Sequence, residues 1–259
     1  MFKKIRVTVL LLILVIVALN SWLDRVRSRN WEHSLRVVVY PINGDHSKIA
    51  ERYIQTLDKT TFSPIEQFFQ NESRRYGIHL RNPVDIRLAP PIAVLPPPLP
   101  RNNNILTIML WSLNMRYWAF RRDNYSGPTP EVRMFVQYFN PAQHQRLAHS
   151  VGLEKGLIGV VQAFASNKMT GKNNIVISHE LLHTVGATDK YDLQNNQPRY
   201  PDGFAAPEQR PLYPQRLAEI MAGRIPLTPT RAIMPKGLQQ VVVGPLTAAE
   251  INWTHPTTQ

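Results

Sequence analysis

Two histidines and a glutamate stand close together in the stretch ISHELLHTVGATDKYD, residues 177–192. On a helix, residues four apart lie on one face, so His179 and His183 would project side by side. Their imidazole nitrogens would both reach one Zn2+ ion, and Glu180 would reach a water molecule that the ion activates. The spacing indicates metal-assisted hydrolysis with Glu180 as general base. The alternative is a buried helix that happens to carry two histidines.

The residues after the second histidine offer a third ligand. Gly186 follows His183 by three positions, and a glycine with positive φ allows a sharp turn at the end of a helix. Such a turn would bring Asp189 back towards the histidines. Two histidines and one carboxylate leave a fourth position open at the metal, as a catalytic zinc site requires. The rival carboxylate ligands are Asp192, Glu208 and Glu219.

The run from His179 to Asp189, HELLHTVGATD, is similar to the metzincin signature of zinc metalloproteases in its version with aspartate as third ligand. The continuation KYD resembles the immune-inhibitor-A-type and snapalysin-type enzymes. The resemblance implies a zinc endopeptidase in which His179, His183 and Asp189 hold the metal and Glu180 is the base. It also implies an α+β fold: a twisted mixed sheet, an active-site helix and an irregular, proline-rich C-terminal subdomain.

Metzincins also carry a methionine turn beneath the zinc, and two methionines compete for that place. Met221 is preferred over Met234, because Ala222 and Gly223 suit a tight turn. Either methionine can instead simply fill the core. The family often has a tyrosine just after this methionine, where this chain has alanine and glycine. Tyr191 is therefore the candidate for transition-state support, unless it only packs.

Strands are expected where β-branched and aromatic residues alternate or run together between turn signals. These segments are residues 34–44, 84–89, 131–139 and 156–166, and the ILTIMLW run within residues 104–121 is also expected to be a buried strand. The strand at 156–166 directly precedes the histidine helix. By analogy with the resembled family, it would form the edge of the cleft and pair with an extended substrate.

Helices are expected at residues 46–57, 63–77, 215–222 and 247–252, besides a histidine helix that begins near Asn174. In the second of these, Ser63 is the expected N-cap, Pro64 suits the first turn and Glu66 completes a capping box. Six prolines within residues 90–100 predict an extended, polyproline-like connection.

The composition limits the classes of function. The chain has 259 residues and no cysteine, which excludes disulfides, thiolate metal ligands and cysteine nucleophiles. The net charge is +12, but much of it surrounds one N-terminal hydrophobic segment, and the remainder forms no basic stripe. No nucleic-acid partner is therefore expected. The other histidines are expected to be surface or structural residues: His33, His46, His79, His144, His149 and His255.

The N-terminal hydrophobic segment, residues 5–19, is apolar apart from Arg6 and Thr8 and follows basic residues. This pattern is typical of a transmembrane anchor or an export signal. No A-x-A cleavage pattern follows, which favours an uncleaved signal anchor with the catalytic domain exported to the periplasm or the extracellular side. Secretion after signal cleavage is the alternative. The expected organisation is an anchor or signal segment at residues 1–29 and a zinc metalloprotease-like domain at residues 30–259.

Three functions compete on these residues. The leading one is a zinc-dependent endopeptidase that hydrolyses a protein or peptide substrate with a metal-activated water and Glu180 as general base. The alternative is a catalytically silent envelope binding module that zinc stabilises. The third is a structural protein without metal. Glu180 favours the first function over the second, because a silent module has no need of a carboxylate at that position.

Overall fold

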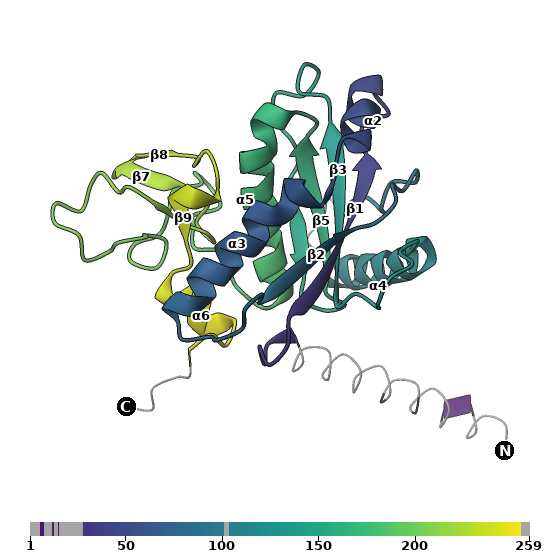
Figure 1. Ribbon diagram of the computed structural model, residues 1–259, viewed down its shortest axis with the longest axis horizontal. Helices are drawn as coiled ribbons and strands as arrows, with labels where there is room; N and C mark the ends of the chain where they lie inside the picture. The colour runs from purple at the N-terminus through teal and green to yellow at the C-terminus, as the bar shows by residue number, and fades with distance from the viewer. Residues whose placement is uncertain (1–5, 8–11, 13–14, 16–27, 101–103, 255–259) are drawn as a thin grey trace.

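A twisted five-stranded sheet runs through the centre of the protein (Figure 1). The computed structural model describes residues 6–7, 12, 15, 28–100 and 104–254. In the sheet order β2-β1-β3-β5-β4, the first four strands are parallel and β4 is antiparallel to β5. The strands are β1 (Leu35–Asn43), β2 (Val84–Leu88), β3 (Val132–Phe139), β4 (Val151–Leu153) and β5 (Ile158–Phe164).

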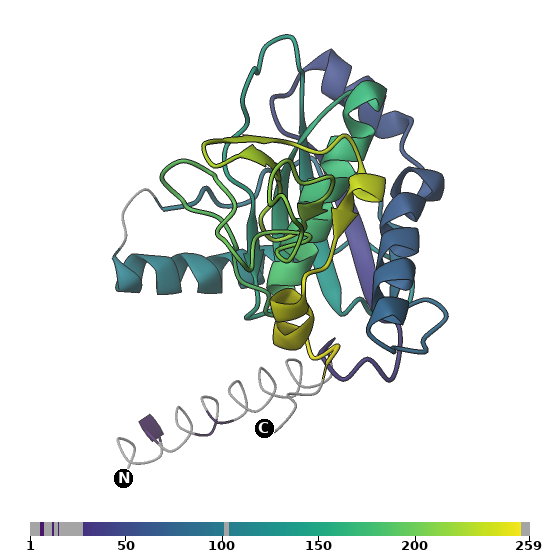
Figure 2. The same cartoon turned by 90° about the vertical axis from the view of Figure 1, so that its left-hand side faces the viewer.

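Helices cover both faces of the sheet. Because side chains of a strand alternate between faces, β1 directs Val37 and Val39 into one core and Val38 and Tyr40 into the other. The first core is completed by α2 (Lys48–Gln55), α3 (Lys59–Arg75), α5 (Thr170–Thr184) and α6 (Pro245–Glu250), and the second by α4 (Ile105–Arg122). Figure 2 shows α3 and α4 on opposite sides of the sheet. The mixed α+β class and the four strands predicted outside residues 104–121 are confirmed.

The chain after α5 is irregular and lies beside that helix (Figure 1). Besides α6, it contains the 3-10 turn η2 (Leu238–Gln240) and the short strands β6 (Ala218–Glu219), β7 (Ile225–Thr228), β8 (Arg231–Ile233) and β9 (Val241–Val242). The helix predicted at residues 215–222 is wrong. Two contacts outside this segment compete with a helix: β6 pairs with β9, and the Gln215 side chain bonds both the N–H and the C=O of Ala206.

The apolar run at residues 105–111 is helical and not a strand as predicted. It forms the first part of α4, whose N-cap Asn104 accepts a hydrogen bond from the N–H of Leu106 at 2.9 Å. An apolar run by itself does not distinguish a buried strand from a helix. The connection does, because β2 and β3 both pair in parallel with β1, and parallel strands are joined by a crossover that is usually helical.

Helix α3 begins earlier than predicted, with Asp58 as its N-cap. Ser63 and Pro64 therefore lie inside the helix. Proline has no N–H to bond to the carbonyl of Thr60, and the Ser63 hydroxyl donates to that carbonyl instead at 2.9 Å. Glu66 does not complete a cap; its carboxylate binds a backbone N–H of β2 at 2.7 Å. The local pattern was right about a helix and wrong about its first turn.

The segment predicted to anchor the chain, residues 5–19, lies almost wholly outside the described residues, as does His255. Among the helices that the structure describes, none combines the length and the apolar character needed to cross a bilayer.

Candidate metal centre

Helix α5 carries both histidines and is held at its start by polar contacts to the sheet. It begins at Thr170, earlier than the predicted start near Asn174, after the 3-10 turn η1 (Asn167–Met169). The side-chain amide of Asn173 bonds both the N–H and the C=O of Phe164 at the end of β5, at 3.0 and 2.9 Å. The buried apolar residues on this helix include Ile175, Ile177, Leu181 and Leu182. The histidines lie on the side that faces the C-terminal part of the chain.

Strand β4 passes against the histidine helix at a glycine. A Cβ on Gly152 would overlap the backbone oxygen of Glu180 and the Cβ of His183, so only glycine permits this approach. The backbone of Gly152 also lowers the pKa of the Glu180 carboxyl. The prediction that the strand at 156–166 forms the cleft edge is wrong, because β4 lies outside it. Where the pairing with β4 ends, the side chains of Ser150 and Asn173 accept hydrogen bonds from backbone N–H groups of β5.

The chain leaves α5 in a turn that returns Asp189 to the histidines. Gly186 has a φ of +99°, the left-handed conformation that favours glycine. The N–H of Ala187 bonds the carbonyl of Leu182 at 3.0 Å and closes the helix end. The turn expected from the sequence is therefore present. It places Asp189 Oδ1 3.2 Å from the Nε2 atom of each of the two histidines.

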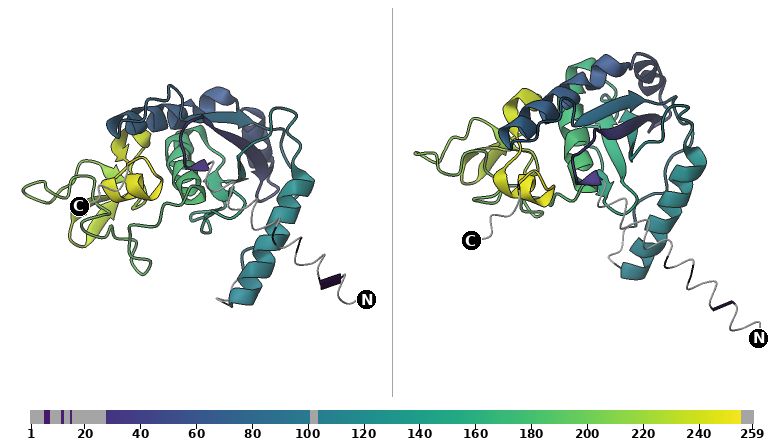
Figure 3. Two further views of the ribbon diagram at one scale, coloured as in Figure 1. Left: turned by 90° about the horizontal axis from the view of Figure 1, so that it is seen from below. Right: turned by 60° about the horizontal axis from the view of Figure 1, so that its bottom comes forward.

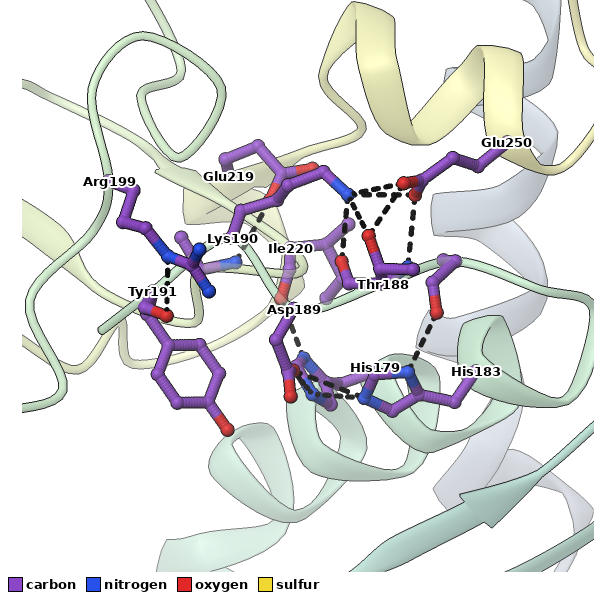
Figure 4. Close-up of polar contacts among 12 residues, drawn as sticks. His179, His183, Thr188, Asp189, Lys190, Tyr191, Arg199, Glu219, Ile220 and Glu250 are labelled. Atoms are coloured by element: carbon purple, nitrogen blue, oxygen red, sulfur yellow. Dashed lines mark hydrogen bonds and ion pairs between the residues drawn. The ribbon is translucent and has the colours of Figure 1, made fainter. Parts of the chain in front are cut away.

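The three side chains converge on one point (Figure 4). The Nε2 atoms of His179 and His183 are 3.1 Å apart. Their Nδ1 atoms donate to backbone carbonyls, that of His179 to Ile220 at 3.0 Å and that of His183 to Ala187 at 2.8 Å. The lone pairs of both Nε2 atoms then face Asp189 Oδ1, which is buried and has no other hydrogen-bond partner among the described residues. Three acceptors this close repel one another unless a metal ion or a proton lies between them.

The arrangement fits a divalent metal ion. In a tetrahedral site with bonds of about 2.05 Å, two ligand atoms lie about 3.3 Å apart. The observed separations of 3.1 and 3.2 Å are close to that value. The contacts from Nδ1 to carbonyls are also those that orient metal-binding histidines in proteins. His179, His183 and Asp189 can therefore hold a metal ion.

The rival carboxylates have other partners, and none belongs to the metal-binding group found among the described residues. Asp192 closes a surface turn by accepting the N–H of Gln194 at 2.8 Å. The side chain of Glu208 is 89% exposed. Glu219 is buried and accepts three hydrogen bonds, from the N–H groups of Ala222 and Gly244 and from the hydroxyl of Thr247.

The buried Glu219 shapes the turn that lies under the first histidine. This turn presents the carbonyl of Ile220 to His179 and buries Met221 completely. Gly223, with a φ of +67°, completes it. Met221, the preferred of the two methionines, thus lies next to the residue that orients a candidate ligand. Met234 is 36% exposed and lines a cavity that opens beside the histidines.

A second buried contact fixes the segment around Asp189 and was missed in the sequence. Lys190 Nζ, whose side chain is 4% exposed, contacts both carboxylate oxygens of Glu250 in α6 at 2.8 Å. Glu250 also accepts the N–H and the hydroxyl of Thr188 at 2.9 and 2.6 Å. The neighbours of Asp189 on both sides are therefore fixed. Sixty residues separate Lys190 from Glu250, so no local pattern indicates the pair.

Charges around the cluster set its protonation when no metal is bound. Burial by itself lowers the pKa of His179, but the hydrogen bond with Asp189 and the charge of Glu180 outweigh burial and raise the pKa to about 9. Burial by itself raises the pKa of Asp189. The hydrogen bonds and charges of the two histidines lower it by a larger amount, so the pKa of Asp189 lies well below its usual value. At neutral pH the metal-free site therefore holds a proton on His179 that balances the charge of Asp189.

Metal affinity should rise with pH. A metal ion must displace the His179 proton below about pH 9, so the apparent affinity for Zn2+ should increase about tenfold per pH unit between roughly pH 6 and 8. The same proton stabilises the metal-free fold. This stabilisation is complete below pH 6.5, the usual pKa of histidine, and is lost as the pH rises through about 9, the pKa of His179 in the fold. Titration against a chelator of known pH-dependent affinity measures the slope. An affinity independent of pH would contradict the protonated site.

Glu180 lies beside the cluster with one oxygen free. It is 5% exposed, and its Oε2 has no hydrogen-bond partner among the described residues. Burial raises the pKa of Glu180 by more than the neighbouring histidines lower it. A buried carboxylate with a raised pKa takes up a proton more readily than an exposed one, which is the property of a general base that works near neutral pH.

A cavity of about 370 Å3 opens beside the cluster and is bordered by His179, Glu180 and Tyr191. The ring of Tyr191 lies 6.4 Å from that of His179. Burial, and then the neighbouring carboxylates, raise the pKa of Tyr191 to about 12, so its hydroxyl keeps its proton at neutral pH. The lining also includes His149, Lys172 and Arg224. His149 therefore has a place near the site that the sequence did not indicate.

The described residues establish a group of two histidines and one aspartate that can hold a metal ion, next to a buried glutamate with a free oxygen. No protein-family model matches the chain, and no curated protein sequence is significantly similar to it.

Proposed function

We propose that this protein is a zinc-dependent endopeptidase with a metzincin-like active site, in which His179, His183 and Asp189 bind zinc and Glu180 is the general base. The observation that carries the proposal is the convergence of three ligand atoms, 3.1 to 3.2 Å apart, beside a buried carboxylate with a free oxygen. The same four residues form the sequence motif, so the spacing along the chain and the geometry agree.

Zinc suits this donor set. Imidazole nitrogens and carboxylate oxygens are its usual ligands in catalytic sites, and three protein ligands leave one position open. Calcium and magnesium prefer sites made only of oxygen atoms, which disfavours them here. A bound zinc ion supplies Lewis acidity, which polarises a peptide carbonyl and activates a water molecule.

Glu180 is proposed to move the proton in peptide hydrolysis. Its carboxylate accepts a proton from the attacking water as the water oxygen bonds to the carbonyl carbon. It then passes that proton to the nitrogen of the leaving amine as the C–N bond breaks. The buried position supports this role, because Glu180 lines the cavity and its Oε2 has no hydrogen-bond partner among the described residues.

Two further features support the binding of an extended peptide. Tyr191 borders the same cavity with a protonated hydroxyl, and we assign it the role of a hydrogen-bond donor to the developing oxyanion. Strand β4 is an edge strand of the sheet, and its Gly152 lies against the backbone of Glu180. A substrate that adds to β4 as a further strand would bring its backbone next to the general base.

The hydrophobic segment at residues 5–19 supports a location at a membrane. We propose that it is an uncleaved signal anchor and that the catalytic domain is exported to the periplasm or the extracellular side. Secretion after cleavage of the segment is the alternative. Edman sequencing of the mature N-terminus in a membrane fraction separates the two.

The test of the proposed function is metal content followed by peptide cleavage. The full chain is purified in detergent without a histidine tag, and zinc is measured by mass spectrometry. We expect about one zinc per chain, cleavage within a peptide library, loss of cleavage after chelation and recovery on addition of Zn2+. One zinc per chain with no cleavage would favour the silent, zinc-stabilised binding module. A folded protein that takes up no zinc would rule out both functions.

A further inference from the structure

Helix α4 carries an apolar stripe on the side that faces away from the sheet. With 3.6 residues per turn, the five members of this stripe fall within an arc of about 80°. They are Leu106, Leu110, Leu113, Tyr117 and Phe120, and each is between 57% and 76% exposed. The opposite side of the helix packs on the sheet through Trp111, Met115 and Ala119. The helix is thus apolar on two faces, of which only one is covered.

The first turns of α4 extend the apolar surface. Ile105, Ile108 and Met109 are 72%, 44% and 57% exposed, and Figure 3 shows this helix projecting from the body of the protein. The proline-rich segment beside it is fixed by a hydrogen bond from Trp111 Nε1 to the Pro97 carbonyl at 3.1 Å. This segment adds three further exposed apolar side chains, Val94, Leu95 and Leu99. A surface apolar over this length is unusual for a face that meets only water.

Basic residues flank the stripe. On the helical wheel, Arg116 lies on one side of the stripe and Arg121 on the other, each within about 80° of its centre. Arg122 follows, and the helix contains no acidic residue. Asp123, at its end, is held by the hydroxyl of Tyr40 and by Arg133 at 2.6 and 2.9 Å. An apolar stripe between arginines suits an anionic lipid surface, where the rings and leucines enter the acyl region and the guanidinium groups meet phosphates.

The anchor proposed above for residues 5–19 would place a membrane within reach of α4, and the inference rests on that part of the proposed function. That segment ends at residue 19, nine residues before Ser28. Ser28 lines a cavity together with Arg133, and Arg133 pairs with Asp123 at the end of α4. Nine extended residues span about 30 Å at most. A bilayer that holds residues 5–19 is therefore within reach of this helix.

We propose that the exposed stripe of α4 is a second membrane contact, which lies in the headgroup region of an anionic bilayer and holds the domain on its surface. Because α4 covers the face of the sheet opposite α5, this contact would turn the metal centre away from the lipid. The cavity beside His179 and Glu180 would then open towards water-soluble protein substrates. The proposal is independent of whether the site is catalytic.

The absence of cysteine allows a direct test by spin labelling of the full chain. Leu110→Cys places a nitroxide on the stripe, and Leu193→Cys is the matched control, since it replaces another exposed leucine in the loop that follows the metal site. Both proteins are reconstituted in vesicles of phosphatidylcholine with phosphatidylglycerol. Collision rates with oxygen and with a nickel chelate are then measured. Retained zinc content and circular dichroism show that each variant is folded.

The expected result is a label at position 110 that collides with oxygen several-fold more than with the nickel chelate, while the label at 193 shows the reverse. Removing phosphatidylglycerol should reduce the difference at 110. Equal access of the nickel chelate to both labels would overturn the proposal, because α4 would then face water. Dipolar broadening at 110 that disappears on dilution with unlabelled protein would also overturn it, because a second copy would then cover the stripe. So would protection from both reagents, which would indicate cover by a protein segment.

Discussion

Glu180→Gln is expected to lower kcat for peptide cleavage by about 100-fold to 10 000-fold, the range that a positioned general base contributes. Glutamine has nearly the same shape as glutamate, but it cannot take a proton from water. The zinc ligands are untouched, so zinc content should stay at that of the wild type. KM should change little, because the lost interaction belongs to the chemical step.

Stability supplies a second readout for this variant. Burial raises the pKa of Glu180 in the folded protein. The ionised side chain therefore lowers the stability of the fold at any pH above the pKa that Glu180 has in the unfolded chain. The neutral glutamine removes that cost, and the metal-free variant should unfold at a temperature no lower than the metal-free wild type. A loss of activity with a lower unfolding temperature would indicate misfolding and not loss of the base.

Glu208→Gln is the matched control for this experiment. It makes the same chemical change at a side chain that is 89% exposed and contacts only Arg210 among the described residues. It should leave kcat, KM and zinc content as in the wild type. A Glu180→Gln variant that retained more than about a tenth of the wild-type kcat would contradict the assignment of Glu180 as general base.

His183→Ala is expected to weaken zinc binding by at least about 100-fold, because it removes a direct ligand, and even the outer partners of such ligands are worth 10-fold to 100-fold. The variant also loses the stabilisation that bound zinc gives to the fold. Saturating Zn2+ should therefore raise the unfolding temperature of the wild type and leave that of the variant almost unchanged. Peptide cleavage should be lost together with the metal.

His149→Ala is the control for loss of a histidine near the cluster. His149 lines the adjacent cavity but stands outside the cluster formed by His179, His183 and Asp189, so zinc content should be unchanged. The same comparison assigns the third ligand. Asp189→Asn should weaken zinc binding, whereas Asp192→Asn, three residues on, should not. Equal zinc affinity in the wild type and in His183→Ala would overturn the metal centre.

Local patterns in the sequence determined the part of this protein that depends on neighbours along the chain. The spacing of His179 and His183 sets their common face on a helix, because a helix repeats every 3.6 residues. Gly186 allows the turn because it can adopt the left-handed conformation that it has in the structure. The four strands that are confirmed were recognised from the runs of β-branched and aromatic residues that suit a buried sheet.

Only the tertiary structure decided the features that depend on distant residues. Asp189 stands apart from its rivals because Thr188 and Lys190 are held by Glu250, sixty residues beyond Lys190. The apolar run of α4 could form a strand or a helix by its composition, and the crossover between two parallel strands selected the helix. Likewise, β4 and not β5 is the edge strand on that side of the sheet, because the chain folds back after β3. The spacing of residues along the sequence does not indicate this turn. Such choices follow from packing and pairing between segments, whose energies no short window of sequence contains.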